Sequence, residues 1–96
     1  MEMAVKVMVA LRLQERPEER QTTIAEMYRV SQSLVSGVLR RLTAHCREVG
    51  AVSKREKLKR GTREHLQRIT LDTSLLWRLL SEKKRGGEHR RSKLSS

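Results

Sequence analysis

Ring aromatics are nearly missing from this sequence of 96 residues: it has no phenylalanine, one tyrosine, Tyr28, and one tryptophan, Trp77. The hydrophobic core must therefore be aliphatic, and this length supports one small domain with a single modest core. We expect dimerisation to stabilise such a thin core. The scarcity also argues against a protein that stacks single-stranded bases on aromatic side chains.

Cysteine occurs once, at Cys46, which excludes an internal disulfide framework and fits the reducing cytosol. No apolar run approaches the length of a membrane span. The apolar start of the sequence is interrupted by Lys6 and Arg12, which argues against a secretory signal. These absences predict a cytoplasmic protein with no membrane partner.

Motifs for metal binding and catalysis are also missing. His45 and Cys46 are adjacent, and His65 and His89 have no partner at ligand spacing, so we expect no metal ion. The sequence contains no Ser/His/Asp arrangement, no paired core carboxylates and no glycine-rich phosphate loop. We therefore predict a protein that is not an enzyme and has no cofactor.

Positive charge is abundant and unevenly distributed, with a formal net charge of +11. Residues 1–39 contain five basic and five acidic residues, which cancel. Residues 40–68 contain ten basic and three acidic residues (+7), and residues 69–96 contain seven and three (+4). This excess predicts a polyanionic partner, and nucleic acid fits better than a membrane because the basic stretches lack an apolar face.

The stretch from Gln21 to Arg41 predicts two short helices joined by a tight corner at residues 27–30, a pattern typical of a DNA-reading unit. Thr23 would cap the first helix, with Glu26 three residues later completing a capping box. Ser31 would cap the second helix, because its hydroxyl can accept a hydrogen bond from an amide of the first turn.

The second of these helices, residues 31–46, has two different faces at about 100° per residue. The apolar face is expected to be core and consists of Leu34, Val35, Val38, Leu39, Leu42 and Cys46. The opposite face is small and hydroxylated and consists of Ser33, Ser36, Gly37, Arg40 and Ala44. Gly37 costs about 1 kcal/mol relative to alanine inside a helix, which close approach to the major groove would offset. The alternative is an ordinary amphipathic helix in a small bundle.

Residues 3–13 fit two structures, because their apolar residues alternate as in a strand and also share one helical face. A strand here would open a ribbon-helix-helix dimer. That architecture needs an apolar helix over residues 15–28, but the segment begins with a polar run around Pro17. We therefore predict a helix over residues 3–14, followed by a loop.

Residues 49–71 also fit two structures. As a hairpin, residues 51–58 and 63–71 are strands and Gly61 supplies the backbone freedom of the turn. As a helix, Ser53 and Glu56 form a capping box and Gly61 a C-cap. The missing apolar stripe and the β-favouring residues 68–71 favour the hairpin.

A final helix is expected to begin after Asp72 or Thr73 and to end near Lys84. Its apolar residues would form either core or a dimer contact, and the helix could also bind a protein partner. These apolar residues are Leu75, Leu76, Trp77, Leu79 and Leu80. Residues 85–96 are predicted to be a disordered basic tail, so the domain spans residues 1–84.

This order of elements resembles the winged helix-turn-helix family of DNA-binding regulators over about residues 3–82. The best-matched piece is TIAEMYRVSQSLVSGVLRRL, in which Ala25 stands at the family's small position between the helices. Arg29 departs from the family's usual glycine at the corner. The resemblance implies a mainly α fold with a small β-hairpin (α+β): a three-helix core, a basic wing and a C-terminal helix.

The family's DNA contacts can be carried over position by position. Base-reading residues would be Gln32, Ser33, Ser36, Gly37 and Arg40. Contacts to phosphates, or from the wing, would come from Thr22, Thr23, Arg41, Lys54, Arg55, Lys57, Lys59, Arg60 and Arg63; the alternative for the basic cluster is a solvated surface. The fork of Arg40 suits guanine, and Gln32 suits adenine.

The resemblance therefore predicts a sequence-specific regulator of transcription that binds double-stranded DNA as a homodimer, with recognition helix 31–46 and basic wing 51–71. Its affinity should fall by about three to five decades between 50 and 200 mM salt if six to ten phosphates are neutralised. The alternatives are a ribbon-helix-helix repressor, a basic RNA-binding protein and an adaptor that docks through its C-terminal helix.

Overall fold

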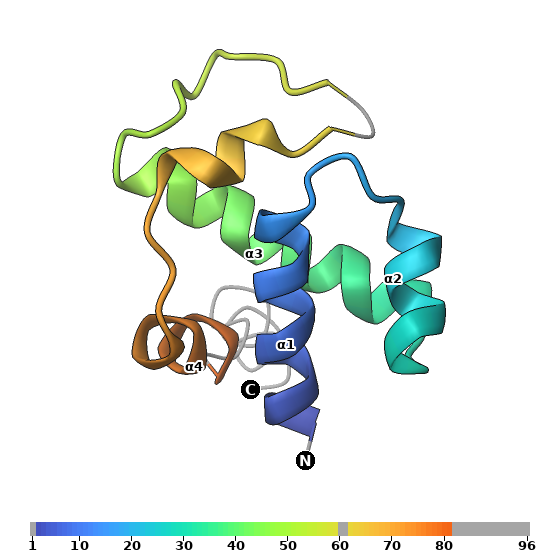
Figure 1. The fold of residues 1–96 in the computed structure, drawn as a ribbon. Coiled ribbons are helices and arrows are strands. Elements are labelled where there is room, and N and C mark those ends of the chain that lie inside the picture. Colours follow the sequence, from blue (N-terminus) through green and yellow to red (C-terminus); the bar gives the residue numbers. More distant parts are fainter. Residues whose placement is uncertain (1, 60–61, 82–96) are drawn as a thin grey trace, which may run out of the picture.

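Four α-helices and one 3-10 helix form in the part of the chain that the computed structural model describes, residues 2–59 and 62–81. They are α1 (Glu2–Glu15), α2 (Gln21–Tyr28), α3 (Gln32–Glu48), η1 (Glu64–Arg68) and α4 (Thr73–Ser81). Figure 1 shows α1 in front of α3, with α2 and α4 on opposite sides of α1. The predicted tail, residues 85–96, and the expected end of the last helix lie outside the described residues.

Helix α1 confirms the prediction for residues 3–14. It packs against α2, α3 and α4, so its buried residues cover a wide arc that includes Val9, Ala10 and Leu13. A strand would bury only alternate residues, whereas here the neighbours Val9 and Ala10 are both fully buried. The strand that a ribbon-helix-helix repressor needs at residues 4–12 is therefore not formed.

The corner between α2 and α3 is tight and regular. Arg29 ends α2 in the left-handed conformation, with φ 56° and ψ 47°. The amide of Val30 donates to the carbonyl of Ala25, and the amide of Arg29 donates to that of Glu26, the pair of bonds that closes a Schellman motif. Glycine usually occupies this position, so Arg29 holds the corner at some conformational cost.

The two predicted caps of these helices have different outcomes. Ser31 caps α3 as predicted: its hydroxyl accepts a hydrogen bond from the amide of Leu34 at 3.1 Å. The capping box at Thr23 is wrong, because the N-cap of α2 is Arg20, three residues earlier, and no side chain caps the helix there. The earlier start lets the amide of Ile24 bond to the carbonyl of Arg20, which places Thr23 inside the first turn.

The core is aliphatic, as the composition predicts, and lies between α1, α3 and the segments that follow. Helix α3 contributes the predicted apolar face, with Val35, Val38, Leu42 and Cys46 buried. The other buried apolar residues are Val7, Val9, Ala10, Leu13, Ile24, Ala25, Val52, Leu66, Leu71, Leu76 and Leu80.

The predicted β-hairpin over residues 51–71 is wrong, since no strand forms among residues 2–59 and 62–81. Turns and irregular backbone occupy residues 50–59, and residues 64–68 form η1. His65 and Leu66 are adjacent and both buried, an arrangement that a helical turn allows and a two-faced strand does not. The described fold is therefore mainly helical rather than α+β.

Helix η1 is held against the end of α1 by side chains from both partners. The amide nitrogen of Gln14 donates to the carbonyls of Leu66 at 2.8 Å and Ile69 at 2.7 Å. In return, the amide nitrogen of Gln67 donates to the carbonyl of Gln14 at 3.2 Å. The two bonds from Gln14 supply donors to carbonyls within the segment that was predicted to be a strand.

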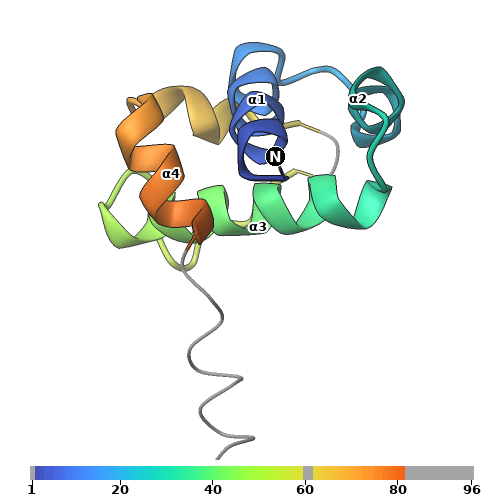
Figure 2. The same cartoon turned by 90° about the horizontal axis from the view of Figure 1, so that it is seen from below.

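Helix α4 closes the core next to α1 (Figure 2). Asp72 caps it, because its carboxylate accepts a hydrogen bond from the amide of Leu75 at 2.7 Å. Of the apolar residues expected in core or dimer contact, Leu76 and Leu80 are buried core residues, while Trp77 is 43% exposed. Leu75 and Leu79 are partly buried. Within the described residues, each helix is too short or too polar to cross a bilayer.

Candidate nucleic-acid interface

One long side of α3 faces away from α1 and forms an edge of the described fold, at the bottom of Figure 2. Gln32, Ser33 and Arg40 are exposed on α3, and Gly37 is partly exposed. The first turn of the helix contains no acidic residue. We call Gln32, Ser33, Gly37 and Arg40 the outer face of α3. This face combines small or uncharged polar residues with one exposed cation.

Ser36, which was predicted to read bases, faces α2. Its hydroxyl donates a hydrogen bond to the side-chain oxygen of Gln21 at 2.7 Å. The bond ties the first turn of α2 to the middle of α3 and so helps to fix the angle between the two helices. Ser36 is thus a positioning residue that has already used its only proton donor.

Gly37 has open space where a side chain would stand: a Cβ atom added there meets no heavy atom within 4 Å. The packing of the folded chain therefore does not require glycine at this position. A glycine inside a helix is destabilising by about 1 kcal/mol relative to alanine. The missing side chain makes the backbone of α3 accessible to an outside partner.

Arg41, which was predicted to lie near phosphates, is used inside the fold. Its guanidinium donates a hydrogen bond to the carbonyl of Leu79 at 2.7 Å, near the end of α4. A cation at this end of a helix is favoured by the exposed carbonyls and the helix dipole. Arg41 therefore links α3 to α4, and its predicted contact to a phosphate stays a prediction.

Thr22 and Thr23 lie in the first turn of α2 and are both exposed. No acidic side chain occupies that turn, and Arg20 directly precedes it. The free amides of a first helical turn attract anions, and nearby hydroxyls can donate to phosphate oxygens. The placement of both threonines is compatible with the predicted contacts to a DNA backbone.

Residues 51–59, which we call the basic loop, leave the end of α3 and run above η1 in the view of Figure 1. The predicted phosphate contacts that the loop exposes are Lys54, Arg55, Lys57 and Lys59. Glu56, the loop's acidic residue, is paired with Arg68 at 3.3 Å. The loop therefore presents a cluster of cations although it forms no hairpin. The predicted contact at Arg60 lies outside the described residues.

The predicted contact at Arg63 is wrong, because its side chain is buried, at 2% exposure. Its guanidinium donates to the backbone carbonyls of Leu13 at 3.3 Å, Arg16 at 2.9 Å and Glu19. These carbonyls lie at the end of α1 and in the turn that leads to α2, where no intrahelical amide can bond to them. Arg63 binds protein backbone and cannot reach a phosphate.

The surroundings of Arg63 explain why a cation is tolerated there. Burial lowers the pKa of the Arg63 guanidinium, and the negative charge of Glu19 partly opposes this effect. The carboxylate of Glu19 is itself held by Arg12 at 2.7 Å, and this hydrogen bond lowers the pKa of Glu19. An always-charged arginine with five donors can satisfy several carbonyls at once.

A second polar cluster lies between η1 and α3 and consists of His65 and Cys46, which are buried, and Thr43, which is partly buried. The Nε2 atom of His65 lies 3.0 Å from the hydroxyl of Thr43, and the thiol of Cys46 lies 3.8 Å from the carbonyl of His65. Burial lowers the pKa of His65 and raises that of the Cys46 thiol, so both groups are kept neutral. The described residues contain no group of metal ligands, and this cluster has the character of a core contact.

Several polar side chains have roles within the fold that the sequence did not predict. Gln14 holds η1, and Gln21 accepts the hydrogen bond from Ser36. Arg41 and Arg63 donate to backbone carbonyls far away in the sequence. No local pattern distinguishes such residues from surface ones.

No protein-family model matches this chain, and neither the curated proteins nor the solved structures contain a significant match to it.

Proposed function

We propose that this chain binds double-stranded DNA sequence-specifically and regulates transcription, with α3 in the major groove. The observation that carries the proposal is the exposed outer face of α3, which follows a tight helix-turn-helix corner. This face presents polar side chains next to the cations of the basic loop. An α-helix has roughly the width of the major groove, so such a helix can lie in it.

The outer face of α3 supplies groups suited to base edges. The guanidinium of Arg40 is exposed, and its fork can bond to O6 and N7 of guanine together. Gln32 can make a similar pair of bonds to adenine, and Ser33 can bond to either edge. Gly37 allows the backbone between these residues to approach the bases closely.

The basic loop would supply affinity that does not depend on sequence. It follows α3 directly in the chain, so a duplex lying on α3 brings phosphates near Lys54, Arg55, Lys57 and Lys59. Thr22 and Thr23 add hydroxyl donors at the start of α2. In this proposal the protein acts in the cytoplasm as a homodimer on an inverted repeat, and the exposed Trp77 is available for the contact between subunits.

The test compares two single substitutions. Arg40→Ala should reduce affinity for the preferred duplex about tenfold or more and relax the preference at one base pair. Lys59→Ala should weaken binding to specific and random duplexes by the same factor, because a phosphate contact carries no sequence information. Binding is measured by fluorescence anisotropy after selection of a preferred duplex from a random pool.

Arg40 and Lys59 are both exposed, so the variants Arg40→Ala and Lys59→Ala should be equally stable. Thermal melts of the two variants provide the control. If both variants lose specific and random binding in equal proportion, α3 is not the reading helix. Competition with double-stranded RNA separates the proposal from the RNA-binding alternative, because RNA's deep major groove does not admit side chains in this way.

Gly37→Ala separates binding from stability. The added methyl group meets no atom of the folded chain, and alanine favours helix by about 1 kcal/mol, so the variant should be more stable by up to that amount. If α3 lies against bases at this position, the same methyl group should weaken specific DNA binding several-fold. Chemical denaturation and anisotropy on one preparation measure both quantities. Unchanged DNA affinity in the stabilised variant would place the bases elsewhere.

A further inference from the structure

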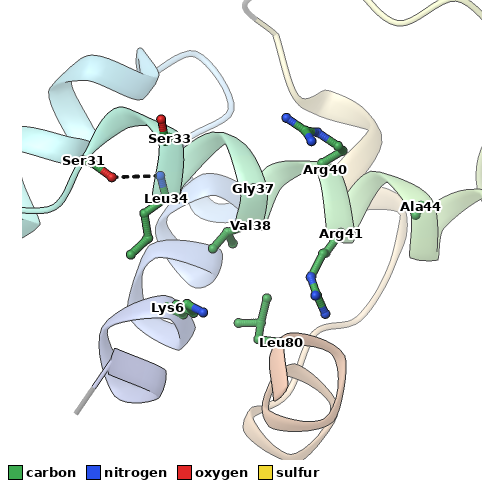
Figure 3. A pocket seen from close by; sticks show the side chains of 10 residues that line it. All are labelled: Lys6, Ser31, Ser33, Leu34, Gly37, Val38, Arg40, Arg41, Ala44 and Leu80. Atoms are coloured by element: carbon green, nitrogen blue, oxygen red, sulfur yellow. Dashed lines mark hydrogen bonds between the residues drawn. The ribbon is translucent and has the colours of Figure 1, made fainter. Parts of the chain in front are cut away.

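A groove of about 680 Å³ runs along one edge of α3, between the start of α1 and the end of α4. Figure 3 shows it from close by. Its lining residues come from three helices and the cap of α3: Lys6, Ser31, Ser33, Leu34, Gly37, Val38, Arg40, Arg41, Ala44 and Leu80. The volume lies within the range of about 300–1,000 Å³ that is usual for small-molecule sites.

The lining combines an apolar floor with positive charge. The larger apolar residues of the lining are Leu34, Val38 and Leu80, and the cations are Lys6, Arg40 and Arg41. No acidic residue lines the groove. A ligand that fits this chemistry carries negative charge at one end and an apolar body at the other.

Two of the cations, Lys6 and Arg41, reach the groove from different helices. In Figure 3 the side chains of Lys6 and Arg41 lie on either side of Leu80, while Arg40 projects away from it. Arg41 is fixed by its hydrogen bond to the carbonyl of Leu79, so its charge is already oriented at the groove. Two cations that approach from opposite sides suit the two oxygen atoms of a carboxylate.

The end of the chain is a poor occupant for this groove, although it follows directly after α4. Residues 82–96 contain six basic and two acidic residues, so their charge has the same sign as the groove. A DNA phosphate could meet the cations, but it would leave the apolar floor without a partner. The chemistry instead favours a compact ligand that uses both parts of the lining.

We propose that this groove binds a small amphiphilic carboxylate, whose head group lies between Lys6 and Arg41 and whose apolar body covers Leu34 and Val38. Ser33, Gly37 and Arg40 belong both to the groove and to the outer face of α3. A bound ligand therefore occupies the edge of the surface that the duplex would approach. The carboxylate would therefore act as an effector that releases DNA. This effect rests on the proposed function, whereas the existence of the carboxylate site does not.

The first test measures ligand binding without DNA. Decanoate is the probe, decanol is the uncharged control, and the readouts are amide chemical shifts and calorimetry below the micelle concentration. Decanoate should shift resonances of the groove residues and bind at least fivefold more tightly than decanol, because only the carboxylate meets the cations. Equal affinity of the two probes, or shifts spread over the whole surface, would overturn the proposal.

The variant Lys6→Gln identifies the head-group site, with Lys57→Gln as the matched control on the basic loop. Lys6→Gln should weaken decanoate about tenfold and leave decanol unchanged, while Lys57→Gln should affect neither. Circular dichroism checks that both variants are folded. Ala44→Trp provides a second variant, because Ala44 is exposed and a larger side chain should fill the groove and block both probes. Unchanged decanoate binding in both groove variants contradicts the assignment.

The second test adds DNA. Decanoate should raise the dissociation constant of the preferred duplex at least fivefold, and Lys6→Gln should remove this effect while its DNA affinity without ligand stays unchanged. If Lys6→Gln alone weakens DNA binding as much as Lys57→Gln, the groove belongs to the DNA interface and the proposal is wrong. If the chain binds decanoate but no duplex, the proposed function fails and the carboxylate site stands.

Discussion

Raising the salt concentration from about 50 to 200 mM should weaken DNA binding by about four decades if the protein binds as a dimer, and by about two if it binds as a monomer. Each subunit offers four exposed cations on the basic loop, Lys54, Arg55, Lys57 and Lys59. Each neutralised phosphate contributes about −0.9 to the slope of the logarithm of the binding constant against the logarithm of the salt concentration. Four cations therefore give a slope of about −3.6 per subunit, and two subunits give about −7. Anisotropy titrations at five salt concentrations measure the slope.

The salt prediction depends on which cations the fold leaves free. Counted from the sequence alone, Arg41 and Arg63 would also contact phosphates, but the fold uses both for bonds to backbone carbonyls. The double variant Lys57→Gln and Lys59→Gln should reduce the slope by about 1.8 per subunit. A matched double variant at the exposed Arg16 and Arg78, which are outside the proposed interface, should leave it unchanged. Equal slopes in the two double variants would remove the basic loop from the interface.

Replacing Arg63 with methionine should destabilise the fold by about 3 kcal/mol, an unusually large effect for a residue from a basic cluster. The substitution keeps much of the side-chain volume but removes every donor. The carbonyls of Leu13, which is buried, and Glu19, which is partly buried, then lose the guanidinium, while that of Arg16 keeps the amide of Glu19 as a donor. For a domain of this size, 3 kcal/mol corresponds to a fall in melting temperature of roughly 12–24 °C.

Arg63→Lys should lose about half as much stability, because one ammonium group cannot reach all three carbonyls with the geometry of a planar fork. Lys59→Met is the matched control: Lys59 is exposed, so its replacement should change stability by no more than about 0.5 kcal/mol. Chemical denaturation measures all three variants. Equal stability of Arg63→Met and Lys59→Met would show that the carbonyls of the α1–α2 turn do not depend on this guanidinium.

The Arg63 series also separates folding from DNA contact. Arg63→Lys, studied well below its melting temperature, should retain the full salt slope, because a side chain that is 2% exposed contributes no phosphate contact. Arg63→Lys should thus lower the free energy of unfolding and keep the salt slope. The double variant at Lys57 and Lys59 should do the opposite, because its salt slope falls and its free energy of unfolding does not. The same residue type, in the same basic stretch, thus serves two purposes.

Much of the helical framework is determined by local sequence. The helix at α1, the apolar face of α3 and the caps at Ser31 and Asp72 were predictable, because each depends on residues three or four positions apart. The conformation of Arg29 has a local cause as well, since its two closing bonds reach only to Ala25 and Glu26. Local spacing alone is not sufficient, because the capping box predicted at Thr23 and Glu26 does not form.

Tertiary structure decided everything that depends on partners far along the chain. Residues 63–71 were predicted to pair as a strand, yet Gln14 and Arg63 reach across 44 to 55 positions and hold this segment against α1 as η1. Arg41 reaches 38 positions to Leu79 in the same way. Propensity and charge describe what a segment can do in isolation, but buried carbonyls must find donors, and only the packed fold determines which side chains are close enough to supply them.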